Sequence, residues 1–496
     1  MKQLRARFRA FIETNKQYPV LIALASGLYP LLYYCNTNFA LINSWVQFTF
    51  LTLLFLVFPI IIFYSIYFVI YYIDIFKKYK THVFTILSFS WFGFLLLLST
   101  KGLKLKLLAI ILLLAFSFGV VLRKHLNKII VLQLFLAAFV SLKLVPDIYR
   151  NFTYSDAWKN QPDDIENVVF KNRPNIYVIQ PDGYANFSEL KKSPYNFDNS
   201  DFESFLESKK FKLYPNFRSN YYSTLSSNSS MFSMKHHYYN NTNKSYYEIY
   251  NSRDHIVGDN SVLSIFKNND YKTFLLLHKS YLVVNRPKLA YDYCNIKYNE
   301  LPFLDRGFSI DKAIENELSY LIKDNTSTKN FFFIEQISPG HIPTLKSTSK
   351  GKEVERETYL KELKEANSWL KSTISSIEEN DNNAIIIIIA DHGGFVGLEY
   401  TLESKIKQEN EDLVKTVFTT ACAIKWPNGN APNYDSKLKS NVNLFRILFT
   451  YLSGNESYLK NLQEDKSFLI IDQGAPLGVY ESIDDDGNVV FNRHSK

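Results

Sequence analysis

Apolar residues are concentrated in the first 146 positions of the chain, and this constrains its fold more than any other feature. They form five long segments, over residues 18–42, 45–74, 82–99, 105–122 and 128–146. Each has close to the roughly 20 residues that a helix needs to cross a bilayer. Because ionisable side chains are almost absent from these segments, we expect an anchor without chemistry of its own. We therefore predict a bundle of about five transmembrane helices over residues 1–146.

The basic residues of the loops between these segments predict the orientation of the bundle. Three of them, Lys101, Lys104 and Lys106, lie on one side of the membrane in a five-span arrangement. Eleven lie on the side of the N-terminus: Lys2, Arg5, Arg7, Arg9, Lys16, Lys77, Lys78, Lys80, Arg123, Lys124 and Lys128. Since positively charged loops stay in the cytoplasm, the N-terminus is expected inside. Five spans then place everything after Val145 outside the cytoplasmic (inner) membrane.

The chain turns polar after the last apolar segment and then changes pattern. Residues 147–173 predict a linker, and residues 174–496 predict a second domain. Strand-like and helix-like segments alternate in that domain, which is typical of an α/β fold. Strands are expected at 175–180, 272–277, 330–337, 384–390 and 417–426, helices at 200–211, 357–380 and 441–453, and a hairpin turn at Asp486–Gly487.

Charge and cysteine content argue against a nucleic-acid-binding protein and against a protein built on zinc or disulfides. A net charge of +8 is modest for 496 residues, and the second domain has no dense run of lysine or arginine. Both observations argue against a nucleic-acid partner. The three cysteines have no CxxC spacing, so neither a zinc knuckle nor a disulfide framework is expected. A single disulfide between Cys294 and Cys422 remains open.

Polar side chains follow three of the predicted strands, at the point where each strand ends. Asp182 follows 175–180, His341 follows 330–337, and Asp391 and His392 follow a run of five isoleucines. Each alone could be a turn residue or a solvated side chain. However, ligand groups gather at the carboxyl ends of the strands in open α/β sheets. Two carboxylates and two imidazoles at one edge predict a metal site.

A hydroxyl-rich segment offers candidates for a nucleophile. Residues 218–239 read RSNYYSTLSSNSSMFSMKHHYY, just before and into a predicted helix. Thr224 or a nearby serine would meet the backbone N–H groups and the positive end of that helix, which favour an anion. A metal ion bound to the hydroxyl would lower its pKa and make it a nucleophile. The alternative is a segment that only caps the helix.

Together these motifs resemble the sulfatase-like branch of the alkaline phosphatase superfamily. More closely, the chain resembles membrane-anchored lipoteichoic acid synthases and phosphoethanolamine transferases. PNIYVIQPDGY is similar to the first metal strand of that group, SNYYSTLSS to its nucleophile segment, PGHIP to its substrate-side histidine and IIIIIADHGG to its paired metal ligands. The resemblance covers about residues 174–455, and it implies a domain with a central, mostly parallel sheet.

The resemblance also implies roles for individual residues. Asp182, Asp391 and His392 would bind one divalent metal ion, and Thr224 would contact the ion and become transiently phosphorylated. His341 would hold the phosphate or protonate the leaving oxygen. The ion could be Mn²⁺, Mg²⁺, Ca²⁺ or Zn²⁺. Two further points stay open: His278 as an additional site residue, and Ser223 or Ser226 as the nucleophile, because this segment is more polar than in the family.

The implied function is transfer of a phosphoglycerol or phosphoethanolamine group via a phospho-Thr intermediate. A membrane phospholipid would be the donor and a cell-surface glycan the acceptor. The alternatives are a hydrolase of phosphate or sulfate esters and a non-catalytic membrane scaffold with a degenerate domain. Sulfate esters are the less expected substrates, because no cysteine lies in the Cys/Ser-x-Pro-x-Arg motif that sulfatases modify to formylglycine.

Overall fold

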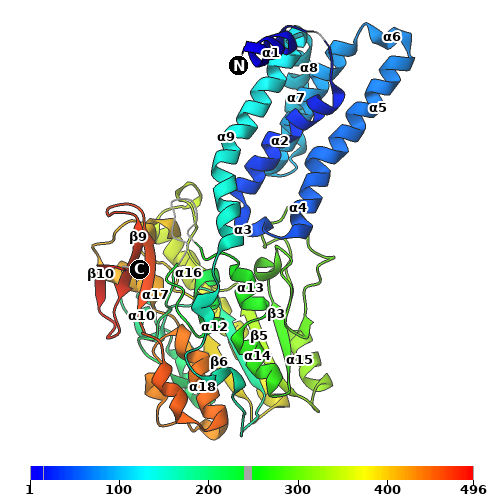
Figure 1. Cartoon of the computed structure of the whole chain (residues 1–496). Helices are drawn as coiled ribbons and strands as arrows, with labels where there is room; N and C mark the ends of the chain where they lie inside the picture. Colours follow the sequence, from blue (N-terminus) through cyan, green and yellow to red (C-terminus); the bar gives the residue numbers. More distant parts are fainter. Residues whose placement is uncertain (1, 15, 240–247, 495–496) are drawn as a thin grey trace. The chain divides into compact units, whose positions relative to one another are not determined.

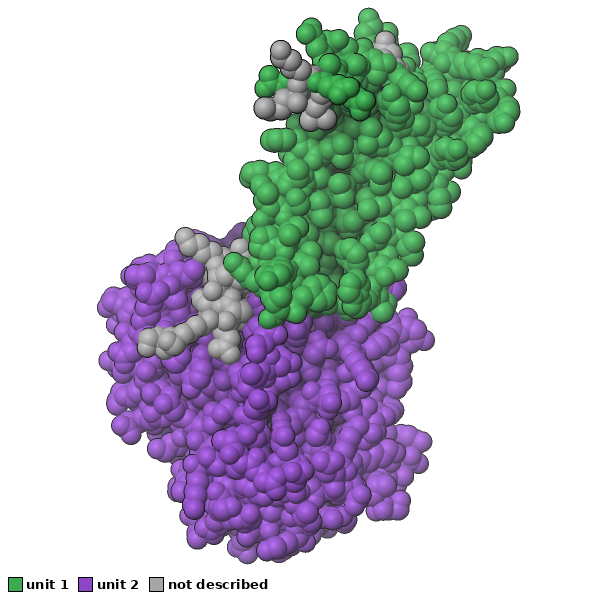
Figure 2. Space-filling view, viewed as in Figure 1, with its two compact units in different colours: residues 1–153 green, residues 154–496 purple. Residues whose placement is uncertain are grey.

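A computed structural model describes residues 2–14, 16–239 and 248–494 (Figure 1). Their contacts divide the chain into two compact units, Met1–Thr153 and Tyr154–Lys496, which are coloured separately in Figure 2.

The described residues of the first unit form helices that short loops connect. Four stretches are long and apolar enough to cross a membrane: Pro19–Thr37, Trp45–Tyr72, Lys80–Lys101 and Arg123–Thr153. The helices of this unit are α1 (Lys2–Glu13), α2 (Pro19–Thr37), α3 (Phe39–Ile42), α4 (Trp45–Thr52), α5 (Phe58–Tyr72), α6 (Asp74–Lys77), α7 (Lys80–Lys101), α8 (Leu105–Val121) and α9 (Leu126–Thr153). A π-helical turn, Leu53–Val57, joins α4 to α5.

Two features of this unit differ from the sequence-based expectation. The fourth predicted span is formed by α8, whose 17 residues rise only about 25 Å, at the short end of what a spanning helix needs. The predicted linker also begins as helix, because α9 continues through Pro146 to Thr153. An ion pair of 3.7 Å between Asp147 and Arg150 lies along this extension, at the spacing that supports a helix.

A mixed sheet forms the centre of the second unit. In the described residues it has seven strands in the order β2-β7-β6-β1-β5-β3-β4. Strands β6, β1, β5, β3 and β4 run parallel, whereas β7 and β2 are antiparallel to their neighbours. Their bounds are β1 (Ile176–Pro181), β2 (Lys212–Leu213), β3 (Tyr271–Leu277), β4 (Tyr293–Cys294), β5 (Lys329–Gln336), β6 (Ile385–Ile389) and β7 (Cys422–Lys425). The prediction of a central, mostly parallel sheet is confirmed.

Both faces of the sheet are covered, which explains the isoleucine run of β6. Ile386 and Ile388 belong to the apolar core on one face, while Ile385, Ile387 and Ile389 belong to the core on the other. Helix α16 (Lys352–Asn380) packs on the first face, and α12 (Thr224–Ser233), α14 (Ser261–Asn268) and α18 (Leu444–Ser453) contribute to the second. A strand buried on two sides is apolar at every position rather than at alternate ones.

The remaining elements surround this core. The other helices are α10 (Phe187–Leu190), α11 (Ser200–Ser208), α13 (Ser252–Val257), α15 (Glu315–Asp324) and α17 (Glu411–Phe418). A second, antiparallel sheet contains β8 (Ser467–Ile471), β9 (Gly478–Ile483) and β10 (Val489–Arg493). The predicted hairpin corresponds to β9 and β10, and Gly487 in its turn has a φ of +89°. The predicted strand 417–426 starts only at Cys422, because Val417 and Phe418 form the buried end of α17.

The cysteines are not paired. All three, Cys35, Cys294 and Cys422, are free and buried. Cys294 lies in β4 and Cys422 in β7, and β6, β1, β5 and β3 separate these two strands. Because neighbouring strands lie about 4.8 Å apart, the two thiols are far beyond the reach of a disulfide. The Cys294–Cys422 disulfide that the sequence left open is therefore excluded in this structure.

Candidate active site

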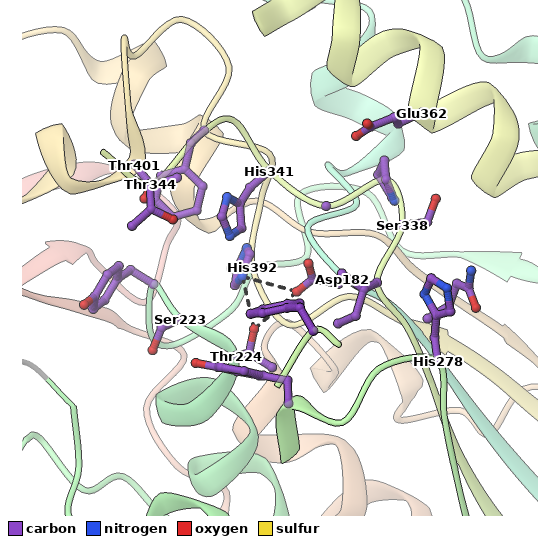
Figure 3. A pocket seen from close by; sticks show the side chains of 18 of the residues that line it. Asp182, Ser223, Thr224, His278, Ser338, His341, Thr344, Glu362, His392 and Thr401 are labelled. Atoms are coloured by element: carbon purple, nitrogen blue, oxygen red, sulfur yellow. Dashed lines mark hydrogen bonds and ion pairs between the residues drawn. The ribbon is translucent and has the colours of Figure 1, made fainter. Parts of the chain in front are cut away.

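Three neighbouring strands at the centre of the sheet end in the predicted site residues. Asp182 follows β1, Asp391 and His392 follow β6, and His341 follows β5. Strand β1 pairs in parallel with both β5 and β6, so the carboxyl ends of all three lie at the same edge. Side chains from distant parts of the sequence thus meet in one place, as Figure 3 shows for Asp182, His341 and His392.

Asp182, Asp391 and His392 form a compact group of potential metal ligands. One ligand atom from each lies within 4.8 Å of the other two. Nε2 of His392 is 3.5 Å from Oδ1 of Asp182 and 3.4 Å from Oδ2 of Asp391. All three side chains are buried, and Oδ2 of Asp391 has no hydrogen-bond partner among the described residues. A cation would satisfy this orphaned oxygen and balance the two carboxylates, so the residues present fit a divalent ion.

The pKa shifts of Asp391 and His392 also favour a bound cation. Burial, offset in part by His392, raises the pKa of Asp391 to about 6. Burial also opposes a charge on His392, but the carboxylates of Asp391 and Asp182 outweigh it and raise the pKa of this imidazole. The Nδ1 atom of His392 donates to the carbonyl of Gly393 at 2.9 Å. When the ring is neutral, that hydrogen bond leaves the lone pair of Nε2 directed at the carboxylates, as a metal ligand requires.

Backbone contacts hold the loops of the site together. The N–H of Asp182 donates to Gln336 at 2.9 Å, and the N–H of Gly340 donates to Asp182 at 2.8 Å. Gly183 has a φ of +68°, and a Cβ there would lie 2.1 Å from the carbonyl oxygen of Gly340. Only glycine fits such a close approach of two backbones. The loops after β1 and β5 are therefore fixed relative to each other.

Thr224 is the first residue of α12 and lies against the three-residue group. Its Oγ1 donates to Oδ1 of Asp182 at 3.2 Å and is 3.4 Å from Nε2 of His392. The hydroxyls of Ser223 and Ser226 point elsewhere: both donate to Oε2 of Glu248, at 2.8 and 2.6 Å. Among the three hydroxyls considered from the sequence, that of Thr224 is the one placed at the potential metal ligands.

The two further histidines lie in the same pocket but outside the ligand group. Nδ1 of His341 donates to the carbonyl of Ile342 at 2.6 Å, and its ring centroid is 5.5 Å from that of His392. The His341 ring is open to the pocket; nevertheless, the protein that surrounds the pocket lowers its pKa, to about 4, and His392 adds to this. His278 pairs with Asp311 at 3.0 Å instead of approaching the ligands.

These residues line a pocket of about 800 Å³ in the second unit. Figure 3 shows Asp182, Thr224 and His392 directed at one another, with His341 beside His392 and His278 on the other side of Asp182. Aromatic side chains form much of the wall: Tyr222, Tyr281, Phe308, Trp369 and Phe395. Sequence reasoning missed this wall and also missed Glu248, because no local pattern marks residues that reach a site only through the tertiary fold.

Comparison with known proteins gives a family and a set of similar structures. A model of the sulfatase family matches residues 202–454, just over half of the chain. No curated protein matches the sequence.

Solved structures that are similar to this chain include the following three. The C-terminal periplasmic domain of EptC from Escherichia coli is 12% identical, with 62% of this chain and 93% of that chain covered and a TM-score of 0.41. Lipooligosaccharide phosphoethanolamine transferase A from Neisseria meningitidis is 14% identical, with 87% and 95% covered and a TM-score of 0.43. Lipoteichoic acid synthase LtaP from Listeria monocytogenes is 13% identical, with 66% and 91% covered and a TM-score of 0.41.

Proposed function

Because this chain belongs to the sulfatase family, we propose that it is a membrane-bound, metal-dependent enzyme that transfers a phospho group. One observation carries the proposal: the Thr224 hydroxyl lies 3.2 Å from Asp182 and 3.4 Å from His392, at the start of a helix. A hydroxyl at this place suits attack on phosphorus. Sulfate-ester hydrolysis is disfavoured because neither Cys294 nor Cys422 lies in the pocket, and Ser223, which does, is followed by Thr-Leu-Ser-Ser and not by the x-Pro-x-Arg of the sulfatase motif.

Asp182, Asp391, His392 and Thr224 would together hold one divalent ion. When bound, such an ion lowers the pKa of a neighbouring hydroxyl and offsets the charge of a phosphate. The set of oxygen ligands with a single nitrogen suits Mn²⁺, Mg²⁺, Ca²⁺ or Zn²⁺.

In the first step, Oγ1 of Thr224 attacks the phosphorus of a phosphodiester. A bond between Oγ1 and phosphorus forms, the bond between phosphorus and the lipid alcohol breaks, and the proton of Thr224 ends on the released alcohol. Negative charge that develops on the phosphate faces the first turn of α12 (Thr224–Ser233). The backbone N–H groups at the start of this helix and the positive end of its dipole stabilise that charge.

In the second step, an acceptor hydroxyl takes the group from Thr224. His341 is suited to remove the proton of that hydroxyl, because its lowered pKa keeps the ring neutral at physiological pH. Its Nδ1 already donates to Ile342, so Nε2 carries the free lone pair. The acceptor oxygen bonds to phosphorus, the bond to Thr224 breaks, and the proton returns to Oγ1. This role as a base extends the phosphate-holding or acidic role that the family resemblance implies.

We propose a membrane phospholipid as the donor and a cell-surface glycan as the acceptor. The four apolar stretches of the first unit support a membrane location. If α8 (Leu105–Val121) also spans the bilayer, the second unit lies outside the cytoplasmic membrane. The anchor would then keep the pocket near lipid donors and raise their effective concentration.

Reconstituted full-length protein tests the proposal. It is loaded with Mn²⁺ and given vesicles that contain phosphatidylethanolamine or phosphatidylglycerol, without an acceptor. We expect the intact mass to increase by one phospho group that maps to Thr224. Release of the group to water without accumulation would instead indicate a hydrolase. A protein that binds no divalent ion and never acquires the group would contradict the enzymatic proposal and favour a scaffold.

A further inference from the structure

Glu248 connects the two hydroxyls that flank Thr224, and sequence reasoning gave it no role. It lies between the hydroxyl-rich segment and α13 (Ser252–Val257). Its Oε2 atom accepts a hydrogen bond of 2.8 Å from Ser223 and one of 2.6 Å from Ser226. Glu248 also lines the pocket that contains Thr224.

The hydrogen bonds form a chain that ends in the backbone of the first turn of α12. Ser223 is the N-cap of α12, and its Oγ accepts the N–H of Ser226 at 3.3 Å. A serine hydroxyl has one proton. Because that proton is donated to Glu248, a lone pair of the same oxygen stays directed at the Ser226 N–H. The carboxylate therefore orients the cap, and it also holds the side chain at the third helical position.

Thr224 lies between these two contacts. It is the residue after the cap, and its Oγ1 must stay within about hydrogen-bond distance of Asp182 and His392. Displacement of a reacting group by about 1 Å can lower a rate by about 100-fold. A contact that fixes the first turn of α12 would therefore control the position of the Thr224 hydroxyl without touching Thr224 itself.

The surroundings of Glu248 are consistent with a fixed carboxylate. Burial raises its pKa, whereas the hydrogen bonds from Ser226 and Ser223 and the positive charges of Lys405 and Arg253 act in the opposite direction. Ser226 is itself fully buried. Two hydroxyl donors on one oxygen satisfy a group that would otherwise be costly to bury.

We propose that Glu248 is a positioning residue, which holds Ser223 and Ser226 so that the Thr224 hydroxyl alone faces the metal ligands. The expected effect on Thr224 phosphorylation rests on the proposed function, whereas the effect of Glu248 on the first turn of α12 does not. The positioning role also gives Ser223 and Ser226 a role other than that of rival nucleophiles, because each of them donates its hydroxyl to the carboxylate.

The test compares Glu248→Ala, Glu248→Gln and wild type in the full-length, Mn²⁺-loaded protein. Hydrogen exchange of peptides that cover residues 221–228 reports the first turn of α12 whether or not the protein is active. We expect faster exchange in Glu248→Ala and near-normal exchange in Glu248→Gln, because a glutamine oxygen can accept both hydrogen bonds. Phospho-Thr224 formation should slow about 100-fold in Glu248→Ala, at an unchanged KM, and recover in Glu248→Gln.

Ser230→Ala is the matched control. Ser230 is a buried residue of the same helix, and its hydroxyl donates to the carbonyl of Lys235 at 2.8 Å, away from Glu248. It should leave exchange at residues 221–228 unchanged. In the Ser223→Ala/Ser226→Ala protein, adding Glu248→Ala should have no further effect, because the contacts are already gone.

The outcomes separate this inference from the proposed function. Unchanged exchange in Glu248→Ala overturns the positioning role, whatever the activity. Equal damage in Glu248→Gln and Glu248→Ala also overturns it, because the carboxylate would then act through its charge. Phosphorylation of Ser223 or Ser226 in wild type would contradict their assignment as hydrogen-bond donors to Glu248 that do not act as nucleophiles. Faster exchange in Glu248→Ala together with no phospho-enzyme in wild type would uphold the positioning role and reject the transferase.

Discussion

The Thr224 hydroxyl donates to Asp182, a residue 42 positions earlier in the chain, at 3.2 Å. The contact joins the start of α12 to the end of β1, and it places an alcohol beside two carboxylates and an imidazole. Two carboxylates that are buried so close together are costly unless a cation balances them. The predictions below follow from this arrangement and from the rest of the fold.

Substitutions of Thr224 test whether its hydroxyl is the nucleophile. Thr224→Ala should lower the rate of group transfer at least about 1,000-fold, because no other atom takes the place of Oγ1. Thr224→Ser keeps a hydroxyl and should retain measurable transfer. The rate is followed as loss of a fluorescent phospholipid donor from vesicles. Metal-dependent transfer by Thr224→Ala at the wild-type rate would exclude Thr224 as the nucleophile.

Metal affinity should depend on pH through Asp391. Its pKa is raised to about 6, so below that pH the ion competes with a proton for the carboxylate. Calorimetric titration with Mn²⁺ should show an affinity that falls at least about tenfold between pH 6 and pH 5, where Asp391 takes up a proton. The decline should begin at higher pH, because the pKa of His392 is also raised and its imidazole must be neutral to bind the ion.

The matching variants are Asp391→Asn, which should lose the ion, and Asp311→Asn, which should not. Asp311 is an exposed carboxylate that pairs with His278 and Lys279 outside the ligand group. An affinity that stays constant down to pH 4, or a wild-type affinity in Asp391→Asn, would remove Asp391 from the ligand set.

His341 should affect chemistry and leave metal binding intact. His341→Gln is expected to slow transfer by roughly 100- to 10,000-fold, the usual range for a lost acid or base. Its metal content, measured by elemental analysis, should equal that of wild type because the ligand group consists of Asp182, Asp391 and His392. Loss of the ion together with activity would instead identify His341 as a ligand.

The cysteines should behave as buried thiols. Burial raises the pKa of Cys294 to about 11, which keeps it protonated and unreactive at neutral pH. A thiol reagent should therefore modify almost nothing in the folded protein. After unfolding without reductant it should titrate all three cysteines. Recovery of a single thiol would show that a disulfide forms after all.

The side of the membrane on which the second unit lies depends on α8. If its 17 residues cross the bilayer, an impermeant maleimide should label Asn196→Cys in intact cells. It should label Lys78→Cys, in the loop after the second predicted span, only after permeabilisation. Both positions are exposed, and the native cysteines are buried. Labelling of Asn196→Cys only after permeabilisation would mean that four helices span the membrane and that the second unit is cytoplasmic.

Much of the fold could be predicted because its central strands are long apolar runs. The isoleucines of β6 and the phenylalanines of β5 leave few alternatives to a buried strand. The ends of the elements were harder to predict where one apolar run forms part of a helix and part of the next strand. The segment 417–426 reads as a continuous strand, yet its first residues close the amphipathic helix α17. Strand β8 (Ser467–Ile471), which is as long as β6, was missed because no turn signal precedes it.

The candidate site shows the same limit. Residues that end a strand, such as Asp182 and Asp391, could be predicted to meet because parallel strands share an edge. Glu248 could not, because its contacts with Ser223 and Ser226 depend on how the chain returns after α12. The separation of Cys294 from Cys422 likewise follows from strand order, which cysteine spacing does not reveal.

The position of β1 between β5 and β6 has a consequence for how the protein is made. Gly183 and Asp391, which are hydrogen-bonded in the site, are 208 residues apart. Strand β1, apolar on both faces, leaves the ribosome long before β6 can pair with it. Such long-range parallel pairing folds slowly and exposes unpaired edges to aggregation. The site therefore cannot assemble before residue 392 has been synthesised, and ion binding would report that β6 has paired with β1.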